Sequence, residues 1–237
     1  MEIKLNQILV LGLLFLLLSC ETRFETNTRV LVKGKVVDDF GQPISNAEIS
    51  VYTQKGTGYI LTPGPSGEDE YLLGRNICNA DGTFSVTSIF DEDVDFFIEV
   101  VSDNNFSEYI YKTSTLFYTP ENLVFDLQTV TLKELVNVNY NISRVSGEGN
   151  SISYTFTFID DFCIEVFEEG ELIENESYCF QDIELNGTLN DNLPNIERNF
   201  SSVLGSIVEF TYSINNQPEV SETFTIGQEN YEFTFTY

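Results

Sequence analysis

From Arg29 to the end of the chain, apolar and polar residues alternate with a period of two. In residues 151–158, which read SISYTFTF, every second side chain is apolar, and residues 207–214 and 230–237 repeat this alternation. A period of two places successive side chains on opposite faces of a β-strand. The pattern therefore predicts an all-β protein whose strands bury one face and expose the other.

Turn residues divide the pattern into two domains. In the first half we expect strands near residues 30–37, 47–52, 83–89, 96–102, 108–113 and 123–132, separated by Gly, Pro, Asp and Asn. Residues 54–79 contain Pro63, Gly64 and Pro65, and this longest irregular stretch predicts an extended loop. The boundary between the two halves falls near Lys133, after the last expected strand of the first half. We therefore predict two β-sandwich domains of the Ig or transthyretin-like kind, at residues 29–134 and 135–237.

Two motifs in the first domain indicate its fold. Residues 32–51 read VKGKVVDDFGQPISNAEISV and residues 79–86 read NADGTFSV. Together they resemble the carboxypeptidase regulatory-like domain, a transthyretin-like β-sandwich, over about residues 30–133. The resemblance implies a noncatalytic module, and turn and core roles for the matching residues. These are Gly34, Asp38, Gly41, Pro43, Ala47, Val51, Asp81, Gly82 and Phe84.

The N-terminus has the features of an export signal. Residues 8–18 are apolar but too few to span a bilayer as a helix, which needs about 20. The sequence LLSC that ends at Cys20 resembles the lipobox of bacterial lipoproteins. The resemblance implies a cleaved signal peptide at residues 1–19, palmitate-type acylation of Cys20 and a spacer at residues 20–28. The alternative is a buried helix and an ordinary thiol.

Charge narrows the range of partners. The chain has 38 acidic and 11 basic residues, a formal net charge of -27 and no histidine. Because such an acidic surface repels the phosphate backbone of nucleic acids, we expect no nucleic acid partner. The absence of histidine excludes imidazole bases and the usual catalytic triads. We expect no cofactor and no enzymatic activity; the alternative is a hydrolase that uses paired carboxylates such as Asp160 and Asp161.

Cysteine and aspartate residues suggest two further features. Cys163 and Cys179 lie in strand-like segments joined by turn residues, so they are the better disulfide pair in an exported protein, although two buried thiols are the alternative. Asp91, Asp93 and Asp95 are candidate Ca²⁺ ligands because calcium binds 6–8 oxygens. The alternative for these three is a solvated acidic connection.

Aromatic residues indicate two candidate binding regions. Tyr59, Tyr71, Leu72 and Leu73 lie in the expected long loop, where apolar side chains rimmed by acids suit a protein partner. A second group near one end of the first domain suits stacking on sugars, although core packing explains such rings equally. This group consists of Tyr109, Tyr111, Phe117 and Tyr118.

These features together predict a membrane-anchored, noncatalytic binding or presentation lipoprotein of the bacterial cell envelope. Its first partner is the lipid bilayer, reached through Cys20, and the outer membrane is the expected location on either face. A protein or a glycan is the expected second partner. The alternative function is an accessory subunit of an outer-membrane uptake or secretion assembly.

Overall fold

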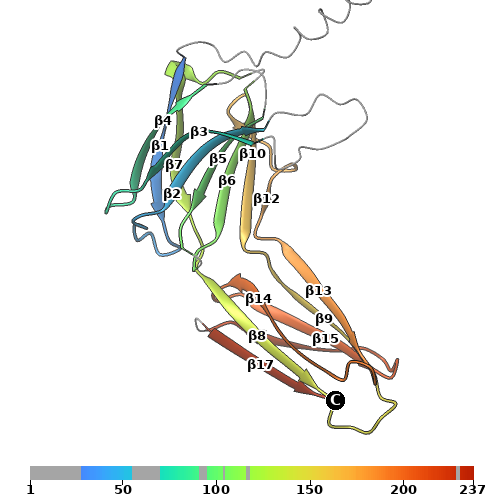
Figure 1. Ribbon diagram of the computed structural model, residues 1–237. Coiled ribbons are helices and arrows are strands. Elements are labelled where there is room, and N and C mark those ends of the chain that lie inside the picture. Colours follow the sequence, from blue (N-terminus) through green and yellow to red (C-terminus); the bar gives the residue numbers. More distant parts are fainter. Residues whose placement is uncertain (1–27, 55–69, 91–94, 104, 116–117, 228–229) are drawn as a thin grey trace, which may run out of the picture.

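The computed structural model describes residues 28–54, 70–90, 95–103, 105–115, 118–227 and 230–237. These residues form two β-sandwiches arranged end to end, so the predicted all-β class is confirmed (Figure 1). The described regular structure besides strands is a short 3₁₀ helix, η1, at Glu121–Leu123. No helix in the described part of the chain has the length and apolarity needed to cross a membrane.

The first sandwich packs a sheet of three strands against a larger sheet. The order in the small sheet is β4-β1-β7, and the larger sheet contains β3-β2-β5-β6. Strand β7 runs parallel to β1, and the other pairs in these two groups are antiparallel. The strands are β1 Arg29–Val37, β2 Glu48–Gln54, β3 Glu70–Ile77, β4 Thr83–Ile89, β5 Asp95–Val101, β6 Glu108–Ser114 and β7 Val124–Thr131.

The second sandwich repeats the topology of the first. Its sheets have the orders β14-β8-β17 and β13-β9-β15-β16, and its first and last strands, β8 and β17, are again parallel. The strands of each sandwich can be numbered from one to seven in chain order, leaving out β10–β12, which are described next. Both sandwiches then have the sheet orders 4-1-7 and 3-2-5-6. The strands are β8 Leu135–Ser143, β9 Ile152–Ile159, β13 Asp182–Leu189, β14 Asn195–Val203, β15 Ile207–Ile214, β16 Val220–Thr225 and β17 Asn230–Thr236.

A segment between the second and third strands of the second sandwich belongs structurally to the first. Strand β10 (Phe162–Glu168) pairs in parallel with β6, and β11 (Glu171–Leu172) and β12 (Tyr178–Cys179) pair with β10. We call residues 162–179 the inserted hairpin. Its residues Cys163, Phe167 and Cys179 pack in the first core. The structure therefore differs from the predicted division, which assigned all residues after 134 to the second domain.

The expected loop at residues 54–79 also differs from the structure. Its C-terminal part forms β3, which pairs with β2 and also lies against β4. Strand β3 lacks the alternation of apolar and polar residues that predicts a strand, because Tyr71, Leu72 and Leu73 are consecutive apolar residues. The β2–β3 ladder also shifts register next to Leu72. Gly74 allows the close approach to β4: a Cβ there would lie 3.0 Å from the Thr87 carbonyl oxygen.

The motif residues of the first sandwich have turn and core roles. The Asp38 carboxylate accepts hydrogen bonds from the backbone N–H groups of Phe40 and Gln42 and so closes the turn after β1. Gly82 has a φ of 78°, and a Cβ at this position would lie 2.4 Å from the Val36 carbonyl oxygen. Both motifs therefore shape the fold and do not form a site.

Candidate functional site

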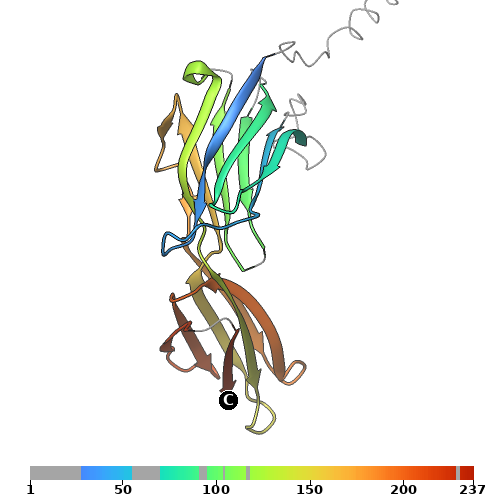
Figure 2. The same ribbon diagram turned by 90° about the vertical axis from the view of Figure 1, so that its left-hand side faces the viewer.

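A cleft of about 560 Å³ opens in the first sandwich between β7 and the inserted hairpin. In Figure 2, β7 (light green) and the inserted hairpin (orange) lie on the same flank of the sandwich, and they belong to its two different sheets. All eight residues of β7 line the cleft, whereas β10 contributes the alternate residues Cys163, Glu165 and Phe167. Successive residues of a strand point to opposite faces, so β7 presents its edge to the cleft and β10 presents one face.

The cleft exists because the two sheets of the first sandwich differ in width. Strand β10 extends the larger sheet beyond β6, whereas the small sheet ends at β7. Among the described residues, β7 pairs with β1 alone. The second edge of β7 therefore offers backbone N–H and C=O groups without a neighbouring strand, beside an uncovered face of β10.

Aromatic rings form the inner wall of the cleft. The ring of Tyr111 stacks on Phe167 with centroids 4.2 Å apart, and Phe125 packs edge-on against both Tyr111 and Tyr118. Tyr109 and Tyr111 are each only 8% exposed. The rings are therefore embedded in the wall and do not form the open, flat platform that sugar stacking requires.

A partly buried polar contact joins the aromatic wall to the inserted hairpin. The Tyr109 hydroxyl donates a hydrogen bond of 2.6 Å to a carboxylate oxygen of Glu165. Burial, together with this bond and the charge of Glu165, raises the pKa of Tyr109 far above its usual value. Tyr109 is therefore a neutral donor near neutral pH, and its hydrogen bond positions the Glu165 carboxylate within the cleft.

The structure brings together part of the predicted aromatic group. Tyr109, Tyr111 and Tyr118 all line the cleft, whereas Phe117 lies outside the described residues. Sequence reasoning did not connect this group with Glu165, Phe167 and Phe180, which also line the cleft. They follow the expected domain boundary, and no local pattern indicates that their segment returns to the first sandwich.

The predicted partner loop is not a single surface. Tyr59 lies outside the described residues, and the other three members of the group belong to strand β3. Tyr71 and Leu72 are 45% and 59% exposed, whereas Leu73 packs against the first core. Leu73 is therefore a structural residue, and Tyr71 and Leu72 lie on an edge strand away from the cleft lining.

The acidic candidates do not converge in the described structure. Asp91 and Asp93 lie outside it, and Asp95 pairs with Lys112 at 3.3 Å. Within the described residues, no group of three or more acidic or cysteine side chains is placed to hold a metal ion. Asp160 and Asp161 do not line the cleft, and the Tyr178 hydroxyl donates to Asp160 at 2.7 Å.

The cysteines of the described structure have different states. Cys163 and Cys179 lie directly opposite each other on β10 and β12 and form a disulfide. Cys78 is a free, buried thiol, and burial, with a contribution from the charge of Asp81, raises its pKa to about 11. The disulfide therefore closes the inserted hairpin beside the cleft, and Cys78 remains an unreactive thiol at neutral pH.

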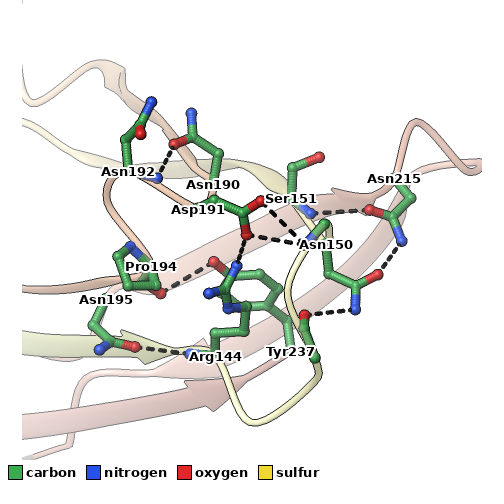
Figure 3. Close-up of polar contacts among 12 residues, drawn as sticks. Arg144, Asn150, Ser151, Asn190, Asp191, Asn192, Pro194, Asn195, Asn215 and Tyr237 are labelled. Carbon is green, nitrogen blue, oxygen red and sulfur yellow. Dashed lines mark hydrogen bonds and ion pairs between the residues drawn. The ribbon is translucent and has the colours of Figure 1, made fainter.

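A second polar cluster lies at the free end of the second sandwich (Figure 3). The Asp191 carboxylate pairs with the Arg144 guanidinium and accepts the N–H of Gly149 at 2.9 Å. Both contacts lower the pKa of Asp191, the Gly149 N–H most strongly. Asn215 accepts the N–H of Ser151 at 2.9 Å. Because these side chains mainly satisfy loop backbone, the cluster orders the loops and offers no enclosed site.

We expect Asp191→Ala to loosen the loop between β8 and β9. The Gly149 N–H would lose its acceptor, so its hydrogen exchange should accelerate at least tenfold, and the urea midpoint should fall because the largely buried Arg144 guanidinium loses its carboxylate partner. Exchange measured by mass spectrometry checks this. Asn192→Ala is the control, because Asn192 joins the cluster through its backbone N–H. Unchanged exchange at Gly149 would show that Asp191 does not hold the loop.

Comparison with known proteins leaves the family open. No family model and no curated protein matches the chain. Among solved structures it is similar to the Bacillus anthracis TIE protein, with 13% identity and a TM-score of 0.33, covering 89% of this chain and 34% of that one. It is also similar to the shaft pilin SpaA of Lactobacillus rhamnosus GG, with 9% identity, a TM-score of 0.29 and coverage of 88% and 97%.

A third similar structure is an enzyme. The 3-chlorocatechol 1,2-dioxygenase of Rhodococcus opacus 1CP shares 12% identity at a TM-score of 0.30, over 46% of this chain and 62% of the enzyme. The present chain thus spans about a third of the TIE protein and less than two thirds of the dioxygenase. At this level of similarity none of the three carries functional information for this chain.

Proposed function

We propose that the chain is a noncatalytic binding lipoprotein of the bacterial cell envelope, tethered through Cys20. The cleft between β7 and β10 carries the binding part of this proposal. It joins an open strand edge to an aromatic wall, and Glu165, the carboxylate that β10 contributes to the described lining, is held by Tyr109. Such a site favours recognition over bond-breaking chemistry.

The arrangement of the sandwiches is consistent with a tether at one end. Strand β1 begins at the end of the first sandwich that lies away from the second (Figure 1). The chain crosses between the sandwiches three times, at the connections β7–β8, β9–β10 and β12–β13. Three crossings oppose hinge motion more than a single linker does. An anchor at Cys20 would therefore hold the second sandwich away from the membrane.

The lipid anchor has a direct test. Cells supplied with an alkyne analogue of palmitate should label the wild-type protein, and Cys20→Ala should lose the label completely because acylation needs the thiol. Cys78→Ala is the matched control and should label like wild type, since the Cys78 side chain is buried. Labelling of Cys20→Ala at the wild-type level would refute the anchor.

A second candidate function is an accessory subunit of an outer-membrane assembly. The open edge of β7 favours it, because unpaired strand edges accept segments of other proteins. Cross-linking in intact cells from a photoreactive residue at Thr129 would separate the two functions. A stoichiometric cross-link to one integral outer-membrane protein supports the accessory role, and cross-links to proteins outside any such assembly, or to a glycan or small molecule, support a stand-alone binding protein.

A further inference from the structure

We propose that the cleft binds an extended, basic segment of another protein, which pairs with β7 as an additional edge strand. This inference rests on the proposed binding function and names the chemistry of its ligand. The segment would extend the small sheet by one strand. It would then cover the face of β10 that the wider sheet leaves open.

The dimensions of the cleft suit a strand. Strand β7 has eight residues, so its edge is about 26 Å long at about 3.3 Å per residue. An added strand would lie about 4.8 Å from β7 and so opposite β10. Its inward side chains would meet Phe167 and Phe180, which line the cleft. Apolar residues at alternate positions are therefore required of the ligand.

The molecule already contains a strand addition of this kind. Strand β10 comes from the second sandwich but pairs with the edge of β6, in parallel, over six residue pairs from Phe162–Glu108 to Phe167–Thr113. The larger sheet thus accepts a strand from outside its own domain. The free edge of β7 is the corresponding position in the facing sheet, directly beside that addition.

Charge around the cleft selects a basic ligand. Glu165 lies in the lining, and the tip of the inserted hairpin, next to the lining residue Gly170, carries three exposed carboxylates. Two cations lie nearby: Lys33 pairs with Asp126 at 2.9 Å, and the Lys133 ammonium lies 4.4 Å from the centroid of the Phe180 ring, so carboxylates still predominate around the cleft. Lysine or arginine on the outward positions of the ligand would complement this rim. The tip carboxylates are Glu168, Glu169 and Glu171.

An irregularity in β7 would contribute selectivity. The β1–β7 ladder shifts register between Lys33 and Lys35, and Gln128 has a φ of 52°. A bulge bends a strand and interrupts its regular hydrogen bonding. A ligand must therefore pair with the two parts of the edge, residues 124–126 and 129–131, in different registers, which an arbitrary strand does not do.

Selection from a displayed library of random twelve-residue peptides tests the proposal, with the full chain in detergent as the target. We expect selected peptides to alternate apolar and polar residues and to be enriched in lysine and arginine. Bound peptide should slow hydrogen exchange in β7 and leave the second sandwich unchanged. A library that yields no binders, or binders that protect residues elsewhere, would overturn the proposal.

Variants of protein and peptide sharpen the test. Glu165→Gln combined with Glu168→Gln, Glu169→Gln and Glu171→Gln should weaken binding at least tenfold, while keeping an acceptor for Tyr109. The matched control neutralises Glu184, Glu197, Glu219 and Glu222, four exposed residues of the second sandwich, and should bind like wild type. Equal binding by both variants would contradict the charge argument.

N-methylation of the peptide distinguishes strand pairing from simple charge attraction. Only alternate N–H groups of an added strand point toward β7. Methylating one alternate set should therefore weaken binding at least tenfold, and methylating the other should have little effect. Equal effects of the two sets would overturn strand addition. Palmitate labelling of Cys20 is independent of these results, so failure of the ligand proposal and failure of the lipid anchor are distinguishable.

Discussion

Excision of the inserted hairpin is expected to lower the free energy of unfolding of the first sandwich by about 5 kcal/mol. This loss falls on the first sandwich even though, in the sequence, the deleted residues follow β9 of the second sandwich. Removing residues 161–180 takes Cys163 and Phe167 out of the first core and exposes the rings of Tyr109 and Tyr111. Burial of one large apolar side chain contributes about 1.5–3 kcal/mol, so loss of several amounts to much of a domain's stability.

The second sandwich provides the internal control for this excision. Ile159 and Asp182 face each other across β9 and β13, and the Asp160 N–H donates to the Gln181 carbonyl at 2.9 Å. An Asn-Gly turn can therefore join Asp160 directly to Gln181. Urea unfolding followed by hydrogen exchange in each sandwich should show loss in the first and none in the second. Unchanged stability of both would mean that the inserted hairpin is only a surface attachment.

Phe156→Ala is expected to destabilise the second sandwich by about 4 kcal/mol. The Phe156 side chain is fully buried, and its ring lies 4.8 Å from the rings of both Tyr140 and Phe210 and 5.3 Å from that of Phe233. It thus packs against the facing sheet through β8 and β17 and against its cross-strand neighbour Phe210 on β15 of its own sheet. Truncation of Phe156 would create a cavity, and the neighbouring rings could fill it only by adopting unfavourable side-chain rotamers.

Chemical denaturation monitored by circular dichroism and by tyrosine fluorescence measures this loss. Val145→Ala is the control in the same domain, because Val145 is 75% exposed and its truncation should change stability by less than about 0.5 kcal/mol. A loss below about 1 kcal/mol for Phe156→Ala would mean that the aromatic core repacks around the gap. The first sandwich should retain its own unfolding transition in either variant.

Strand positions were predictable because their signals are local. The alternation in residues 151–158 and 207–214 predicts β9 and β15, since a strand with one buried face needs an apolar residue at every second position. Asp81 and Gly82 predict the turn before β4 through their own backbone preferences. Strand β3 could not be predicted in this way, because its apolar residues are consecutive and its ladder contains a register shift.

The all-β class, most strands and the two regions of alternation that form the two cores follow from the local residue pattern. The return of residues 162–179 to β6, which brings Glu165 and Phe167 to Tyr109 and Tyr111 in a cleft, does not follow from it. Alternation specifies which face of a strand is buried but not which neighbour the strand pairs with. Any free strand edge offers β10 the same kind of backbone hydrogen bonds as β6 does, so the partner of β10 depends on contacts between residues more than 50 positions apart, such as Tyr109 and Glu165.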